Sequence, residues 1–498
     1  MGQLDLMCRE REQRFRQIHD GSTSSFAIRK DSPCRRDDDF HDGNISYPVT
    51  ELSEDIWCHI HSLLTLRDAA RAACVSHTFL RSWRCYPNLI FDSETLGPLW
   101  GGMDFSSRVD HILKKHSGIG VKTFELNFSS YYKPKAFKYL DRWLQIAVTP
   151  GIEKLTLVMP KNETACNFPC PVLSDGNGSS IGYLHIVDCA FRPTFSLGCL
   201  RSLTVLHLDC VQITGDELGC LFSSSVALEQ LKLRRCSEIT CLKIPIWLQR
   251  LSYLHVLQCD RLRMLKIEAP NICSFYFTTC DQVDVSLGES LRLKNLDMLC
   301  CGLLCYAREE LPSIVPNLET LCIRSRREVV NTKMAFVPSK FLHLKYLSVC
   351  ITEAYDYFSL VSFLVAAPLL ETFILSVRIR PQYIDELLGE DAPHLRKMPG
   401  CRHDKLQRVK ISRFHSSKSL VELTSHIIEN SSSMESLTLD TTDGVFRCSD
   451  GRPDKCFCLG RPMEAHKAVL VIRKYIDGKV PSRVKLNFVE PCSRCHAC

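Results

Sequence analysis

The chain has 498 residues, of which 45% are hydrophobic and 24% are charged, and its formal net charge is +6. This composition is ordinary for a soluble globular protein, and at about 100–200 residues per domain the length predicts roughly two to four domains. The charge is too dilute to indicate a nucleic-acid partner, and no run of about 18 apolar residues predicts a membrane span.

Residues 1–44 are polar and charged, and they contain too few apolar side chains to bury a core, so we expect a disordered tail. Its arginines leave two interpretations open, a nuclear-import patch and a plain solvated tail. The chain start lacks the apolar core of a secretion signal. The 28 cysteines are therefore expected to be thiols in the reducing cytoplasm or nucleus.

Residues 48–92 carry a pattern typical of three short helices. Ser53 is suited to capping the first, and the apolar residues of one helical face follow it, namely Ile56, Ile60, Leu63 and Leu64. An alanine-rich run over 68–74 predicts the second helix, and residues 79–83 belong to the third. Because so small a core is barely sufficient by itself, we expect apolar surface to remain for a partner.

From about residue 120 onward, pairs of apolar residues separated by one residue recur along the chain. Between Leu157 and Leu375 the second residue of each pair returns every 21–29 residues. This is the period of leucine-rich repeats, in which each unit adds one short strand to a parallel solenoid. The sequence therefore predicts an α/β solenoid over residues 93–402, with 378–402 as a candidate insertion.

Five cysteines lie three residues after the second apolar position of their repeat: Cys189, Cys236, Cys259, Cys280 and Cys301. The repeat pattern places Asn or Cys at this position, where a small side chain turns inward after the strand. We therefore interpret these cysteines as packing residues rather than catalytic residues or metal ligands.

The residues between the paired apolar positions point away from the core by strand alternation. Because parallel strands lie about 4.8 Å apart, we expect a ladder of polar side chains on the concave face. The predicted target-binding residues are His185, His207, Lys232, Arg234 and His255. They predict a basic, partly titratable surface for an acidic or phosphorylated partner. A merely solvated face is the alternative.

After residue 402, repeat-like pairs return at 409–411 and 437–439, with a helical pattern between them. The region 441–498 predicts a helix near 463–477, a strand at 484–488 and a cluster of potential ligands. These are Cys448, Cys456, Cys458, Cys492, Cys495, His496 and Cys498. No second, separate Cys-x-x-Cys accompanies the one at Cys492 and Cys495, so we predict no metal and no cofactor, with a zinc-stapled terminal unit as the alternative.

The segment 45–92 resembles the F-box in the order and spacing of its residues. The matching positions are Leu52, Glu54, Asp55, Ile56, Ile60, Leu63, Leu64, Leu66, Arg67, Asp68, Ala69, Arg71, Val75, Ser76, Phe79 and Trp83. The Leu-Pro of the family is here Leu52-Ser53, and Ser53 can cap the helix in place of a proline. The whole chain resembles plant F-box proteins with leucine-rich repeats, and residues 403–440 are similar to their FBD module.

The resemblance implies a non-catalytic substrate receptor of an SCF-type cullin–RING ubiquitin ligase. The F-box would bind the adaptor subunit and, through it, the cullin and the RING protein, while the repeats bind an unknown target protein. Activity would come from proximity. The implied adaptor contacts are Leu52, Ile56, Ile60, Leu63, Leu64, Leu66, Asp68, Ala69, Val75, Ser76 and Trp83.

An interaction scaffold that never joins a ligase is the first alternative to this reading. An enzyme has little support, because the chain contains no phosphate-binding glycine loop and no H-E-x-x-H motif.

Overall fold

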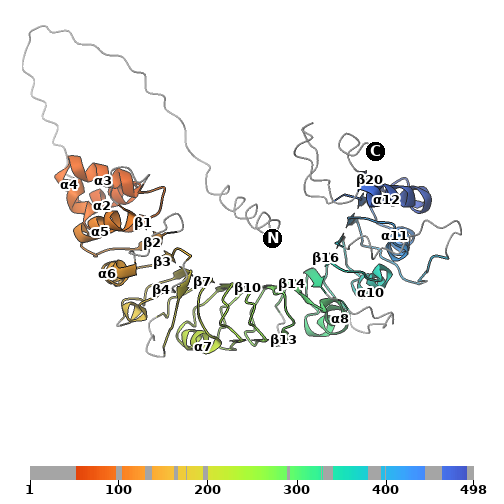
Figure 1. Ribbon diagram of the computed structural model, residues 1–498, viewed down its shortest axis with the longest axis horizontal. Helices are drawn as coiled ribbons and strands as arrows, with labels where there is room; N and C mark the ends of the chain where they lie inside the picture. The colour runs from red at the N-terminus through yellow and green to blue at the C-terminus, as the bar shows by residue number, and fades with distance from the viewer. Residues whose placement is uncertain are drawn as a thin grey trace, which may run out of the picture. The chain divides into compact units, whose positions relative to one another are not determined.

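A computed structural model of the chain describes residues 52–96, 104–128, 137–161, 166–174, 176–194, 200–288, 292–326, 328, 340–378, 394–398, 400–442 and 462–490. The chain divides into two units, residues 1–52 and residues 53–498, and the second is described here by itself. Its repeats form an arc with strands on the inner side and helices on the outer side (Figure 1). The predicted tail over 1–44 lies outside the described residues. Among those described, no helix has the length and apolar content needed to cross a membrane.

Three short helices begin the second unit: α2 (Glu54–Ser62), α3 (Leu66–Val75) and α4 (His77–Trp83). Thr65 and Ser76 cap α3 and α4, because their side-chain oxygens accept hydrogen bonds from the backbone N–H groups of Asp68 and Phe79. Ser53 occupies the N-cap position of α2, but its side chain makes no capping hydrogen bond. The expectation that this side chain caps the helix is therefore wrong.

The inner layer is a 15-stranded parallel sheet in the order β1-β2-β3-β5-β7-β8-β10-β12-β14-β15-β16-β17-β18-β19-β20. Its strands are β1 (Asn88–Phe91), β2 (Thr123–Asn127), β3 (Lys154–Val158), β5 (Tyr183–Val187), β7 (Val205–Asp209), β8 (Gln230–Arg234), β10 (Tyr253–Leu257), β12 (Ser274–Thr278), β14 (Asn295–Cys301), β15 (Thr320–Arg326), β16 (Tyr346–Ile351), β17 (Thr372–Val377), β18 (Arg408–Ser412), β19 (Ser436–Asp440) and β20 (Lys485–Val489). Every apolar pair between Leu157 and Leu375 lies in one of these strands, which confirms the predicted solenoid.

The outer layer is built mainly of helices that pack on the paired apolar residues. Its helices are α5 (Phe105–Lys115), α6 (Phe137–Ala147), η2 (Cys170–Leu173), α7 (Gly215–Ser224), α8 (Leu303–Glu309), α9 (Leu311–Ile314), η3 (Tyr357–Leu360), α10 (Val361–Ala366), α11 (Lys418–Asn430), α12 (Pro462–Tyr475) and η6 (Asp477–Lys479). One continuous core runs between the two layers, from Leu66 to Val484.

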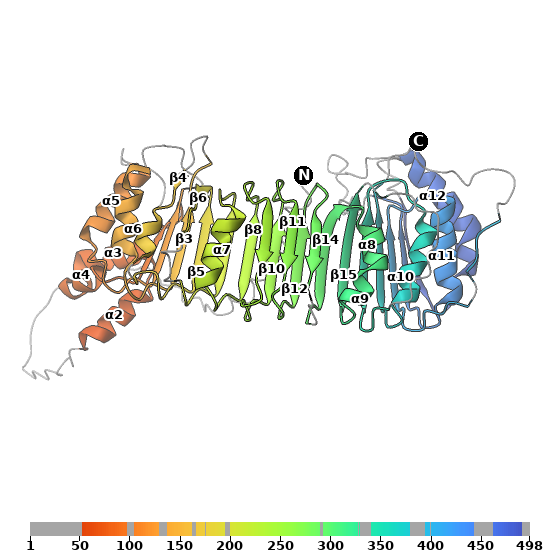
Figure 2. The same cartoon turned by 90° about the horizontal axis from the view of Figure 1, so that it is seen from below.

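Between α7 and α8 the outer layer changes from helix to strand (Figure 2). A second parallel sheet there has the order β13-β11-β9 and consists of β9 (Cys241–Ile244), β11 (Met264–Ile267) and β13 (Asp284–Leu287). The repeats are short here, with spacings of 23, 21 and 21 residues from Leu233 to Met298. A strand rises about 3.3 Å per residue and a helix about 1.5 Å, so a short repeat closes with a strand. A further two-stranded pair is formed by β4 (Cys166–Asn167) and β6 (Cys189–Ala190).

The cysteine positions divide according to how the chain turns after each strand. Asp188, Arg235 and Gln258 have φ angles of 52°, 54° and 53°. This left-handed residue directs the next side chain inward, and the one that follows it is Cys189, Cys236 or Cys259, all buried.

The inward position predicted for Cys280 and Cys301 is wrong. Thr279 has no left-handed φ angle and is itself buried, which leaves Cys280 exposed. Strand β14 continues to Cys301 instead of turning, and this side chain is half-buried. All cysteines in the described part of the chain are free thiols.

Candidate functional site

The three front helices expose large apolar side chains to solvent. Ile56, Leu63, Val75 and Leu80 are 45%, 73%, 85% and 40% exposed, respectively. They come from α2, its C-cap, α3 and α4. Single exposed apolar residues are common, but four within about 25 residues of one small helical unit mark a surface suited to a partner. We call these four residues the apolar face.

The other implied adaptor contacts lie in different environments. Leu66, Ala69 and Trp83 are buried, and a stack with 5.7 Å between ring centroids joins Trp83 to Tyr86. These three side chains therefore hold the helices together and are not accessible to a partner. Ile60 and Leu64 are half-buried.

The polar members of the set serve the local fold. Ser76 caps α4, and Asp68 lies in the first turn of α3, where it accepts a hydrogen bond from the Thr65 hydroxyl at 2.9 Å. Leu52 is 42% exposed but belongs to the unit formed by residues 1–52.

Buried polar contacts fix the front helices to the first strand of the sheet. His61 donates a hydrogen bond from Nε2 to the Ala69 carbonyl at 2.9 Å, and its ring packs on Tyr86. The Tyr86 hydroxyl in turn donates to the Leu64 carbonyl at 2.7 Å, and the Asn88 side chain donates to the Ser62 carbonyl. Sequence analysis did not single out His61 or Tyr86, because neither belongs to the F-box pattern. These contacts present the apolar face from a rigid support.

The sheet brings the predicted concave residues together in one ladder. His185 pairs in register with His207, His207 with Lys232, and Lys232 with His255. Arg234 is in register with Asp209, and their side chains form an ion pair at 3.0 Å. The ladder extends in both directions along the same face. We call its central part the concave strip: Thr156, His185, His207, Lys232, His255 and Tyr276.

Tyrosine rings line the concave strip, and the sequence analysis missed them. Tyr183 and Tyr253 begin strands β5 and β10 and point to the same face as the strip. The Lys232 ammonium lies 5.5 Å from the centroid of the Tyr253 ring, and Tyr253 packs against Tyr276 at 5.3 Å. Tyr183 contacts His207 with 5.4 Å between ring centroids. A signal was present for two of the three histidines, since the tyrosines two positions before His185 and His255 share their face.

Burial and neighbouring cations keep the strip histidines neutral. Burial and, to a smaller extent, the nearby Lys232 lower the pKa of His207 to about 3. The pKa of His255 is lowered to about 4 by the same two causes, and burial also lowers the pKa of His185. The predicted titratable surface is therefore corrected, because these rings carry no charge near neutral pH. The positive charge of the ladder comes from Lys232 and Arg234.

Two buried polar atoms of the concave strip have no hydrogen-bond partner. They are Oγ1 of Thr156 and Nε2 of His207, whose other ring nitrogen lies 3.3 Å from the Tyr183 hydroxyl. An unsatisfied buried polar atom costs about 1–3 kcal/mol, so such atoms call for a partner. Thr156 and His207 flank His185 in the ladder, which places both atoms along one line across the strands.

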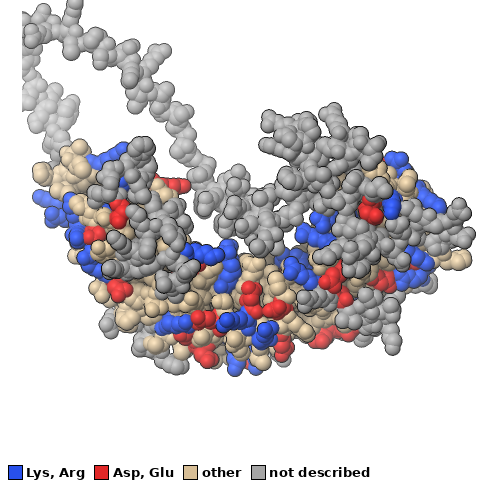
Figure 3. Space-filling view, viewed as in Figure 1, with Lys and Arg blue, Asp and Glu red and all other residues tan. Residues whose placement is uncertain are grey.

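Acidic side chains near the concave strip are already paired with arginines. Asp209 contacts both Arg234 and Arg235, at 3.0 and 3.1 Å, and Asp297 contacts Arg324 at 2.7 Å. On the inner side of the arc, Lys and Arg atoms gather over the region of β7 in the space-filling view (Figure 3). The strip therefore lies in an environment with an excess of positive charge.

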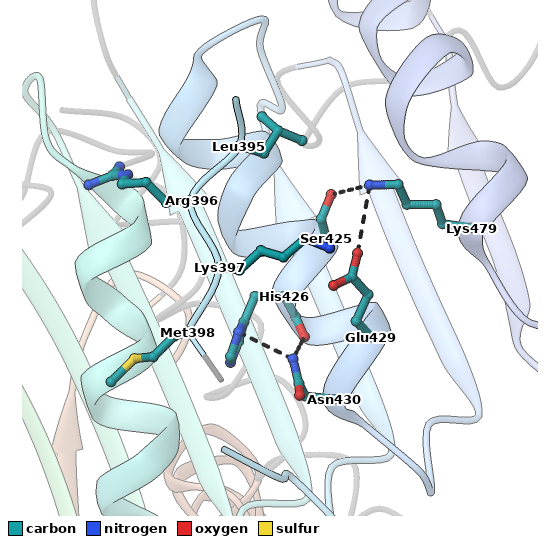
Figure 4. Close-up of a pocket in the computed structure, with 9 residues that line it drawn as sticks. All are labelled: Leu395, Arg396, Lys397, Met398, Ser425, His426, Glu429, Asn430 and Lys479. Atoms are coloured by element: carbon teal, nitrogen blue, oxygen red, sulfur yellow. Dashed lines mark hydrogen bonds and ion pairs between the residues drawn. The ribbon is translucent and has the colours of Figure 1, made fainter. Parts of the chain in front are cut away.

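A second polar site lies at the other end of the arc, beside α11. A cavity of about 150 Å³ is lined by Leu395, Arg396, Lys397, Met398, Ser425, His426, Glu429, Asn430 and Lys479 (Figure 4). We call residues 394–398 the strap. Arg396 anchors it by donating to Glu422 at 2.8 Å and to Asp356 at 2.6 Å. The predicted insertion over 378–402 is thus attached to α11 through the part of it that the structure describes.

The described residues offer no ready place for a metal ion. No group of three or more His, Cys, Asp or Glu side chains among them could hold one. The tail cysteines, from Cys448 to Cys498, lie outside the described residues.

Comparison with known proteins places the repeats in a described family. Residues 112–493 match the family described as "At1g61320/AtMIF1, LRR domain". The chain is 24% identical over 216 residues to F-box/FBD/LRR-repeat protein At1g13570 of Arabidopsis thaliana, which covers 42% of the chain and 48% of that protein. It is 23% identical over 415 residues to F-box/FBD/LRR-repeat protein At5g53840 of the same plant, which covers 78% of the chain and 87% of that protein. The chain thus spans about half the length of the first relative.

Proposed function

Because the chain belongs to the At1g61320/AtMIF1 leucine-rich-repeat family and is a plant F-box/leucine-rich-repeat protein, we propose that it is the substrate-recognition subunit of an SCF-type ubiquitin ligase. Its front helices dock the adaptor subunit, which connects the chain to the cullin and the RING protein. The concave side of the repeats binds the target protein. The chain acts by proximity, which raises the effective concentration of the target near the ubiquitin-charged enzyme, in the cytoplasm or the nucleus.

The exposed apolar face is the observation that carries this proposal. Leu63 and Val75 keep most of their surface in water although the neighbouring Leu66 and Ala69 are buried. Burying an exposed Leu or Val side chain stabilises a complex by about 1.5–3 kcal/mol. A partner helix or loop that covers this face would bury these side chains, and the complex would be stabilised by that free energy.

The proposal is tested by placing a charge on the apolar face. In the full chain, Leu63→Asp and Val75→Asp should each weaken adaptor binding by about tenfold or more, because a charge would be buried in the complex. Binding of purified plant SCF adaptor is measured by titration calorimetry. Ile119→Asp is the matched control, because Ile119 is 70% exposed but lies outside the three helices.

Two results would contradict the proposal. One is wild-type chain that does not bind the adaptor at all, which would leave an interaction scaffold as the remaining function. The other is equal loss of binding in Ile119→Asp and Leu63→Asp, which would show that the apolar face is not the contact. Far-UV circular dichroism of each variant ensures that loss of binding is not loss of fold.

A further inference from the structure

The concave strip combines three features that define what it can bind. Its rings are neutral and half-buried, its positive charge is at Lys232, and two of its polar atoms lack a partner. From Thr156 to His255 the ladder crosses four strand intervals. At about 4.8 Å per interval this is about 19 Å, the length of roughly six residues of extended peptide.

The apolar part of the strip favours a peptide over a free small anion. Tyr183, Tyr253 and Tyr276 present ring surface beside the polar ladder. The Tyr183 and Tyr276 rings contact the imidazoles of His207 and His255 at 5.4 and 5.7 Å between centroids, and Tyr253 packs on Tyr276 at 5.3 Å. Aromatic rings supply contact area at low entropic cost, which suits recognition of a chain segment. A small anion would contact the ammonium but would leave these rings uncovered.

The charge at the middle of the strip favours an acidic segment. Among the outward residues of β5, β7, β8, β10 and β12, the one acid is Asp209, and it is already bound by Arg234 and Arg235. Lys232 lies between His207 and His255 in the ladder. An acidic oxygen placed there meets a cation in a partly desolvated site, where a charge-assisted hydrogen bond is strong.

We propose that the concave strip binds an extended acidic segment of the target protein that runs across the strands, with an anionic oxygen at Lys232 and a hydrogen-bonding group between Thr156 and His207. This inference rests on the proposed function, because it names the chemistry of the target that the receptor selects. The anionic oxygen belongs to a carboxylate or to a phosphoryl group, which share this recognition chemistry.

The test measures peptide binding to the full chain by fluorescence anisotropy. The probes are labelled peptides of about nine residues, slightly longer than the strip. They are Gly-Ala-Asp repeats, Gly-Ala-phosphoserine repeats and neutral Gly-Ala-Asn repeats. At least one anionic peptide should bind about tenfold tighter than the neutral one, and added salt should weaken this preference. A response to phosphoserine alone assigns the oxygen to a phosphoryl group, and a response to both assigns it to anionic charge in general.

Substitutions locate the binding on the strip. Lys232→Met keeps the length of the side chain and removes its charge, so anionic peptide binding should fall about tenfold. Lys410→Met is the matched control, because Lys410 occupies the same row on β18, where it pairs in register with Ile374 and Thr438. Thr156→Val removes one unpartnered oxygen and should weaken binding of the anionic peptide severalfold.

Equal binding of neutral and anionic peptides would overturn the inference, as would equal loss in Lys232→Met and Lys410→Met. Adaptor binding is measured on the same proteins. Peptide binding without adaptor binding would retain the strip and remove the ligase role. Adaptor binding without peptide binding would remove the strip and retain the ligase role.

Discussion

The front helices and helix α11 differ in which kinds of side chain they expose and bury. In α2–α4, Leu63 and Val75 are 73% and 85% exposed. These are apolar side chains left in water. Helix α11 instead buries polar side chains, because Glu422 and His426 are only 1% and 4% exposed. Both regions are short amphipathic helices packed on the ends of one solenoid. The difference is what covers them: η3, η6 and the strap contact α11, and α12 lies beside it (Figure 1), whereas no described segment covers the apolar face.

Whether a side chain of these helices is exposed therefore depends more on which segments of the chain pack over it than on the amino-acid composition of its helix. Glu422 can be buried because Arg396 reaches over α11 and neutralises it. That salt bridge depends on a strap more than twenty residues away in the chain. The apolar face has no equivalent cover within the described residues, and under the proposed function the adaptor subunit would cover it.

The largest effect should come from uncovering α11. Arg396→Met leaves the Glu422 carboxylate buried without its guanidinium and should lower the free energy of unfolding by about 3 kcal/mol. Replacing both partners, Arg396→Met with Glu422→Leu, should restore much of this loss. Urea unfolding gives the magnitude, and hydrogen exchange shows whether α11 opens first.

The neighbouring Lys397 provides the control for the strap. It is exposed and lies in the same segment, so Lys397→Met should change the free energy of unfolding by no more than about 0.5 kcal/mol. A loss as large as that of Arg396→Met would mean that the strap, rather than the buried ion pair, provides the stability.

An intermediate effect should separate buried from exposed leucines in the front helices. Leu66→Ala removes a side chain that is 5% exposed and should cost about 2–3 kcal/mol, while Leu63→Ala should cost less than about 0.5 kcal/mol. The prediction for adaptor binding is the reverse: when both variants are folded, Leu63→Ala should lose more affinity for the adaptor than Leu66→Ala. Thermal unfolding and adaptor titration check both parts. Similar losses of stability in the two variants would show that the Leu63 side chain packs against the core.

The smallest effect concerns the histidines that α11 buries. His403 and His426 face each other with 3.1 Å between their Nε2 atoms, and the Asn430 amide donates to the other ring nitrogen of His426. Burial lowers the pKa of both, and burial together with the proximity of His426 brings that of His403 to about 4. Asp404 and Glu429 oppose these shifts.

The sign of the resulting pH dependence follows from proton binding. An unfolded histidine takes up a proton near pH 6.5, whereas folded His403 resists protonation until about pH 4. The unfolded chain therefore binds more protons in this range, and the free energy of unfolding should fall by up to about 2 kcal/mol from pH 7 to pH 5. His403→Leu should reduce this fall. An unchanged slope in urea unfolding would exclude the pair as its cause.

Much of the inner layer was predictable from the residue pattern. The period of apolar pairs places the strands from β3 to β19, and strand alternation places His185, His207, Lys232 and His255 in one row. Both are local properties, because the side chains of a strand alternate with period 2 whatever surrounds them. Strand β1 was missed, since Asn88–Phe91 is short and follows a helical pattern directly.

Other features depended on contacts that the residue pattern does not contain. The neutrality of His207, the inaccessibility of Trp83 and the buried pair of Glu422 with Arg396 each depend on segments that meet only after folding. Periodicity and motif spacing by themselves determined the repeat architecture and the front helical unit. Tertiary structure decided which side chains remain in water and which titratable side chains are charged, because burial and ion pairing depend on distant parts of the chain.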